Sequence, residues 1–280
     1  MARKASCWLT AAAVVTAVAV SACGTQTTPT VSTVGGGVSQ ASSGQAAVPT
    51  REVGNCLDGT SSSASYYAPR IQAMLADAVA NWASRPAANP SAGVPAAPGL
   101  HFVLRSVTTD SYSTDGPSVD GTIPPVAALA PQPTPSDPSF DADIHSWTQA
   151  LPGWKQTQTS AAASASQLSA EVRQYRVARN TFSAIYSCVS GAARQLGQAQ
   201  GADTRLAVIS DMENNEPVVG LNLAAAEVLM VTICPASVST GCPQRFAAAR
   251  SYLIRHGASS VQIVSADAVT AETFDAFWRN

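Results

Sequence analysis

Two aspartates follow short apolar runs at the points where β-strands are expected to end. Asp58 comes directly after residues 53–57, and Asp211 follows residues 206–209 and one serine. Parallel strands carry functional side chains at their carboxyl ends, so both carboxylates are expected at the same edge of a sheet. Carboxylates suit a hard cation such as Mg²⁺, which takes about six oxygen ligands. The sequence therefore predicts a cation site built on two strand ends.

Hydroxyl side chains accompany both aspartates. Asp58 begins an Asp-Gly-Thr-Ser-Ser run, and Thr181 opens an expected helix over residues 182–196. This arrangement resembles the metal-ion-dependent adhesion site of von Willebrand factor A-type domains, in which the first loop reads Asp-x-Ser-x-Ser. The resemblance covers residues 53–280 by the order of motifs and elements. It implies a site for a divalent cation, expected to be Mg²⁺, with the ligands Asp58, Thr60, Ser62, Thr181 and Asp211.

In that family, an acidic group of a protein partner often completes the coordination of the ion. The resemblance therefore implies cation-dependent binding of a protein partner. A simpler reading of the first loop stays open, in which Asp58 and Ser62 only cap the helix that follows.

The elements that position these residues alternate along the chain. Strands are expected at residues 53–57, 101–107, 206–209, 228–233 and 261–264, and helices at 71–82, 160–178, 182–196, 243–256 and 271–278. Such alternation predicts a single α/β domain over residues 51–280, Rossmann-like, with a mostly parallel central sheet and helices on both faces. The Pro-, Ser- and Asp-rich stretch 108–138 predicts a long loop or disordered excursion.

The first residues carry the pattern of an export signal. Arg3 and Lys4 precede an apolar run over 11–20, and the sequence Val-Ser-Ala-Cys ends at Cys23. A cysteine after small residues resembles the lipobox of bacterial lipoproteins, which implies removal of residues 1–22 and diacylation of Cys23. An ordinary secretory signal with a chance cysteine is the alternative. Residues 23–50 then predict a lipidated cysteine and a flexible tether, at the extracytoplasmic face of the cell membrane.

Four cysteines remain in the predicted domain, and export favours disulfides among them. Cys234 and Cys242 are close in sequence and flank a Pro/Ser/Thr/Gly loop, so they are expected to pair. Cys56 and Cys188 would then form the second bridge. Two separate buried thiols at Cys56 and Cys188 remain an alternative.

Charge and motifs narrow the function. A net charge of −2 gives no electrostatic case for nucleic acid. The chain has no Gly-x-Ser-x-Gly elbow and no phosphate-binding Gly-rich loop. We therefore expect a lipid-anchored binding protein rather than an enzyme, acting on a protein partner at the cell surface. The alternatives are a two-lobed solute-binding lipoprotein and a metal-dependent hydrolase that uses the same two carboxylates.

Overall fold

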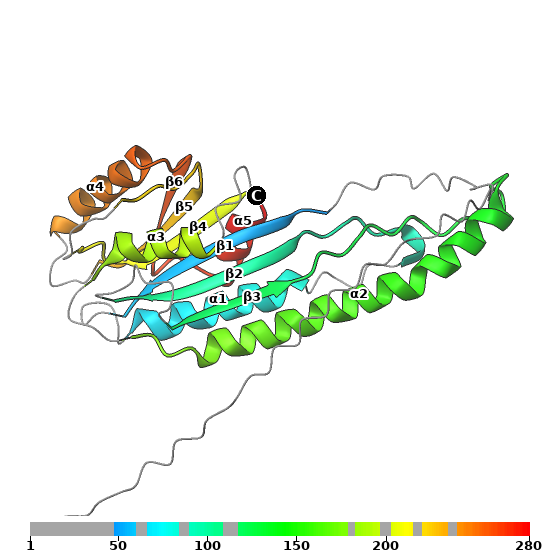
Figure 1. Ribbon diagram of the computed structural model, residues 1–280, viewed down its shortest axis with the longest axis horizontal. Coiled ribbons are helices and arrows are strands. Elements are labelled where there is room, and N and C mark those ends of the chain that lie inside the picture. The colour runs from blue at the N-terminus through cyan, green and yellow to red at the C-terminus, as the bar shows by residue number, and fades with distance from the viewer. Residues whose placement is uncertain are drawn as a thin grey trace, which may run out of the picture. The chain divides into compact units, whose positions relative to one another are not determined.

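Six segments rich in apolar and β-branched residues form the strands of one sheet (Figure 1). They are β1 (Thr50–Asp58), β2 (Gly99–Val107), β3 (Ser118–Ile123), β4 (Thr204–Ser210), β5 (Glu227–Thr232) and β6 (Ser260–Ser265). Their order across the sheet is β3-β2-β1-β4-β5-β6. All neighbours are parallel except β3, which runs antiparallel to β2 at the edge. The predicted mostly parallel sheet is confirmed.

A computed structural model describes residues 48–59, 66–83, 90–108, 117–178, 183–196, 203–214, 220–234 and 240–280. Every described element belongs to one compact unit, Ala46–Asn280. This unit also contains both buried cores and both disulfides. It is a single α/β domain with its own core, as a separately folding domain requires.

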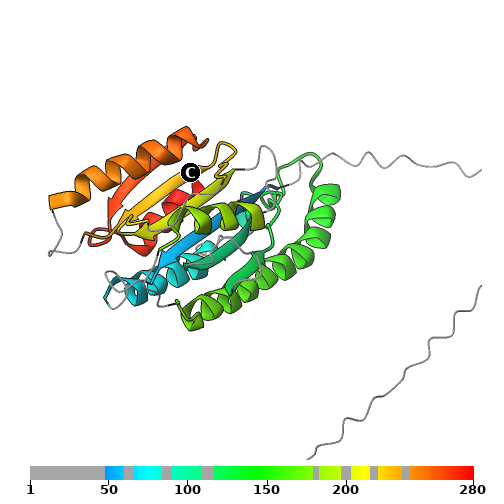
Figure 2. The same cartoon turned by 60° about the vertical axis from the view of Figure 1, so that its left-hand side comes forward.

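Helices cover both faces of the sheet (Figures 1 and 2). One core packs the sheet against α1 (Tyr67–Ala83), α2 (Phe140–Gln174) and α5 (Ala271–Arg279). The other packs it against α3 (Ile185–Gln195) and α4 (Cys242–Arg255). Successive strand residues face opposite sides, so Leu57 lies in the first core and Cys56 in the second. A short 3₁₀ helix, Pro90–Ala92, precedes β2.

The sheet reverses its direction of growth between β1 and β4. The chain first adds β2 and β3 on one side of β1 and then returns to add β4, β5 and β6 on the other. In open α/β sheets, binding sites form at such a switch point, beyond the carboxyl ends of the two strands. Here those ends are Asp58 and Ser210.

Both predicted disulfides are confirmed. Cys56–Cys188 ties β1 to α3, and Cys234–Cys242 links the segment after β5 to the start of α4. The alternative of two separate thiols at Cys56 and Cys188 is wrong.

The expectation of an excursion over residues 108–138 is wrong for part of that range. It contains β3, which has only one neighbour in the sheet and buries Val119 and Ile123 alternately against the first core. Residues 108, 117 and 124–138 are described outside any strand or helix, and residues 109–116 lie outside the described part.

The helix α2 begins about twenty residues before the expected start. Its additional turns carry Trp147, Leu151 and Trp154 at helical spacing, and all three pack against the first core. The indole N–H groups of Trp147 and Trp154 donate to the carbonyls of Ala130 and Ala127. These bonds tie α2 to residues 127 and 130 on both sides of Pro152, which lacks the backbone N–H donor of other residues.

An imidazole links the first three strands. His101 Nδ1 on β2 lies 2.6 Å from Glu52 Oε2 on β1, and its Nε2 lies 2.9 Å from Asp120 Oδ1 on β3. Burial lowers the pKa of His101, but hydrogen bonds to the Asp120 and Glu52 carboxylates outweigh it and raise the pKa above its ordinary value. We call these three residues the His101 cluster.

Candidate functional site

The carboxylate of Asp58 is fully buried at the end of β1. Ser210 Oγ donates to Asp58 Oδ2 at 2.7 Å, and Ser183 Oγ lies 3.4 Å from the same oxygen. The pairing of Leu57 with Ile209 brings Asp58 and Ser210 side by side on the face that α3 covers. A buried carboxylate is costly unless it is hydrogen-bonded, and these hydroxyls help to meet that need.

The segment that leads into α3 contacts Asp58 and Gly59 through its described residues Ala178 and Ser183. A Cβ atom added at Gly59 would lie 2.3 Å from the carbonyl oxygen of Ala178, so only glycine permits this approach. Ser183 lies against Asp58 on the other side of Thr181. Ala178 and Ser183 therefore both pack against the chain at the carboxyl end of β1.

The start of α3 is fixed by the chain that follows β4. The backbone N–H of Ile185 donates to Asn214 Oδ1 at 2.9 Å. This bond satisfies one of the free N–H groups at the start of the helix. The Asn214 side chain thus ties the segment containing Ser183 to the carboxyl end of β4.

Asp211 is buried in a tight turn directly after β4. Its Oδ1 accepts a hydrogen bond from the Glu213 N–H at 2.9 Å, and the Met212 N–H donates to Ser210 Oγ at 2.9 Å. Met212 has a φ of 60°, a left-handed conformation that is uncommon outside glycine. The turn therefore fixes the Asp211 carboxylate next to the strand end that carries Ser210.

Arg245 of α4 borders the Asp211 side of the site. Its NH1 lies 3.3 Å from the Asp211 carbonyl oxygen, 3.4 Å from Glu213 Oε2 and 4.0 Å from Asp211 Oδ2. The guanidinium therefore offsets negative charge at the outer part of the site. A cation that uses the Asp211 carboxylate would have to share it with this side chain.

The structure brings the two predicted aspartates to neighbouring strand ends, as expected. The other predicted ligands, Thr60, Ser62 and Thr181, lie outside the described residues, as does Cys23. Sequence reasoning missed the hydroxyls of Ser183 and Ser210. The position of Ser210 was predictable. It lies two residues after Val208, which faces α3, and it directly precedes Asp211.

Oxygen donors gather at this edge of the sheet. Two carboxylates and two hydroxyls offer the oxygen ligands that Mg²⁺ prefers, and Asp58 is already oriented by hydroxyl donors. Among the described residues, no group of three or more His, Cys, Asp and Glu side chains is arranged to hold a metal. An ion at this edge would therefore depend on the hydroxyls as well as the carboxylates.

Comparisons with known proteins returned no relatives. No protein-family model, curated protein or solved structure matches this chain. Within the described residues, no helix is long and apolar enough to cross a membrane.

Proposed function

We propose that this chain is a lipid-anchored binding protein at the extracytoplasmic face of the membrane. It binds a protein partner through a divalent cation held at the carboxyl ends of β1 and β4. The observation that carries the proposal is the buried Asp58 carboxylate, which is bonded to hydroxyls at the switch point of the sheet. The lipobox-like sequence ending at Cys23 supports the anchor.

The proposed ligands are Asp58 and Asp211, with Thr60, Ser62 and Thr181 from the two adjoining loops. A bound divalent cation would supply an open coordination position for a carboxylate of the partner. Ser210 orients Asp58, and Asn214 holds the start of α3 near the site. The close packing of Gly59 on Ala178 supports the approach of the first loop to the segment before Thr181.

The described residues form one sheet with helices on both faces, whereas a two-lobed solute-binding protein needs two such units joined at a cleft. The architecture therefore favours a site on the edge of one sheet.

Thermal unfolding of the unit Ala46–Asn280 tests the cation. With Mg²⁺ at about 100 times its Kd, a ligand that binds only the folded state adds about 2.7 kcal/mol. For a domain of this size, that corresponds to a rise in Tm of about 5–10 °C over the chelated protein. Asp58→Asn should abolish the rise, because it removes the charge while keeping the side-chain volume.

Asp141→Asn is the matched control, since it removes the same charge from an exposed position in the first turn of α2. This variant should keep the full rise. No rise in the wild-type protein with either Mg²⁺ or Mn²⁺ would contradict the cation site. A short Glu-containing peptide then tests the open coordination position: its binding should require the cation and be lost in Asp58→Asn.

A further inference from the structure

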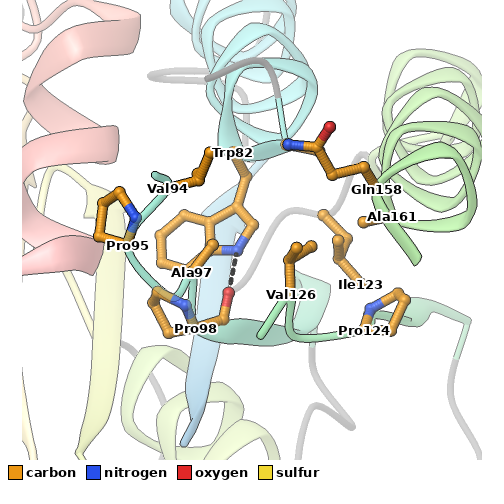
Figure 3. Close-up of a pocket in the computed structure, with 11 residues that line it drawn as sticks. Trp82, Val94, Pro95, Ala97, Pro98, Ile123, Pro124, Val126, Gln158 and Ala161 are labelled. Atoms are coloured by element: carbon orange, nitrogen blue, oxygen red, sulfur yellow. Dashed lines mark hydrogen bonds between the residues drawn. The ribbon is translucent and has the colours of Figure 1, made fainter. Parts of the chain in front are cut away.

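An apolar pocket lies at the opposite end of the sheet from Asp58, where β1 and β2 begin and β3 ends. Figure 3 shows its lining residues. Its cavity volume is about 270 Å³. Trp82 from the end of α1, Pro98, Ile123 and Val126 contribute to its lining, and α2 contributes Ala161. None of its 11 lining residues, all in the described part of the chain, is charged.

The indole of Trp82 is held in place without a ligand. Its N–H donates to the carbonyl oxygen of Pro98 at 3.2 Å, the bond drawn in Figure 3. The guanidinium of Arg279 lies 4.4 Å from the centroid of the indole ring. Because its polar atom already has a partner, Trp82 offers the pocket an apolar ring surface.

The facing wall is fixed as well. Ala97 and Val126 exchange both backbone hydrogen bonds, at 2.8 and 2.9 Å. The indole N–H of Trp154 on α2 donates to the carbonyl of Ala127 at 3.1 Å. The walls are therefore hydrogen-bonded to one another, as is typical of ligand pockets that are formed before the ligand arrives.

We propose that this pocket binds one alkyl chain of a membrane lipid. An apolar cavity of about 150 Å³ stays dry and takes a benzene molecule, which has six carbons. At the same ratio, about 270 Å³ accommodates about ten to eleven carbons. Uncharged walls match a saturated chain, because it brings no polar group that must be hydrogen-bonded.

The position of the pocket supports a lipid as the source of the chain. Gly99, which follows the lining residue Pro98, donates its N–H to the carbonyl of Pro49 at 3.0 Å. The segment that connects to the expected lipidation site Cys23 therefore joins the fold beside the pocket. About 25 residues separate Cys23 from Pro49, so an anchor at Cys23 keeps the pocket within about 90 Å of the bilayer even if this segment is fully extended.

The anchor itself is not the occupant. A single acyl chain gives only marginal membrane attachment, so both chains on Cys23 have to stay in the bilayer to hold the protein there. The alkyl chain comes from another lipid. This inference rests on the proposed anchor and is independent of the cation site at the other end of the sheet.

Titration of the unit Ala46–Asn280 with n-alkanols from hexanol to tetradecanol, followed by calorimetry, tests the pocket. This unit lacks Cys23, so the anchor cannot contribute. Each added methylene should raise the affinity about fourfold up to about ten carbons, after which the affinity levels off. No binding of decanol, or an affinity that does not depend on chain length, would overturn the proposal.

Two variants locate the binding. Ala161→Phe fills the cavity from α2, and Ala83→Phe narrows it from the end of α1. Each should lower the affinity for decanol at least tenfold. Ala163→Phe places the same side chain on the exposed face of α2 and should leave the affinity unchanged.

Folding of the variants is checked by circular dichroism, and Ala83→Phe serves if Ala161→Phe does not fold, because Ala83 is only half-buried. If a folded pocket variant bound decanol as tightly as the wild-type protein does, the alkyl chain would not bind in this pocket, and the proposal would be contradicted. The rise in Tm with Mg²⁺ should be the same in all three variants, so failure of the alkyl-chain proposal is distinguishable from failure of the cation site.

Discussion

Replacing Ser210 by alanine tests the central contact of the candidate site. Its hydroxyl donates to Asp58 Oδ2 at 2.7 Å and accepts from the Met212 N–H at 2.9 Å. Asp58 and Ser210 are fully buried, and Met212 is 4% exposed. Water therefore does not readily replace the lost partner. A hydrogen bond to a carboxylate contributes about 1.5–3 kcal/mol and a neutral one about 0.5–1.5 kcal/mol, so Ser210→Ala should destabilise the domain by about 2–4 kcal/mol.

Urea unfolding of the unit Ala46–Asn280, followed by far-UV circular dichroism, measures this loss. The midpoint should fall while the slope of the free energy against urea stays the same, because the surface exposed on unfolding is unchanged. Ser251→Ala is the control, because Ser251 is exposed on α4 and its hydroxyl donates to the carbonyl of Ala247, within the same helix. It should change stability by less than about 0.5 kcal/mol. A similarly small effect for Ser210→Ala would refute the described coupling of β4 to Asp58.

Two further predictions concern the stability of the same unit. Because the pKa of His101 is raised in the folded protein, the stabilisation by the His101 cluster is complete below the unfolded pKa of about 6.5 and is lost as the pH rises through the folded pKa. Urea midpoints between pH 6 and 9 should show this fall in the wild-type protein, and His101→Gln should lack it; identical profiles would count against the cluster. Alanine at both Cys56 and Cys188, which are 132 residues apart, should cost about 5 kcal/mol, and alanine at both Cys234 and Cys242, 8 apart, about 2.5 kcal/mol. If both double variants lost the same stability, loop-closure entropy would not determine how much each disulfide contributes.

Much of the fold follows from local patterns in the sequence. The apolar run at residues 206–209 lies in β4, and the run at 228–233 covers β5 and one residue beyond its end; both strands are buried on both faces and are recognisable without their partners. The disulfides were also predictable, because only four cysteines remain after Cys23 and two of them flank a short loop.

The features that the sequence did not predict depend on tertiary contacts. The edge strand β3 alternates apolar and polar residues over only six positions, within a Pro-rich stretch. The first half of α2 is largely exposed and contains Pro152, so its stability depends on the two indoles that bond to residues 127 and 130.

In the candidate site, the strand ends were predictable and the surrounding contacts were not. Asp58 and Asp211 each follow an apolar run, and this order alone places them at the same edge of a parallel sheet. Arg245 reaches the Asp211 turn from α4, and no spacing in the sequence indicates that approach. Ser183 likewise contacts Asp58 across 125 positions of the chain.

The central position of β1 has a consequence for the order of folding. Glu52 pairs with Thr204 of β4, so β4, the second neighbour of β1 in the sheet, is synthesised about 150 residues after β1. A chain that emerges N-terminus first can pair β1 with β2 early. The other edge of β1 stays unpaired until β4 has been synthesised. Such long-range parallel pairing is slow, and an open strand edge promotes aggregation in the meantime. The domain should therefore need protection of that edge during its biogenesis, and mutations that slow the arrival of β4 should reduce yield more than they reduce final stability.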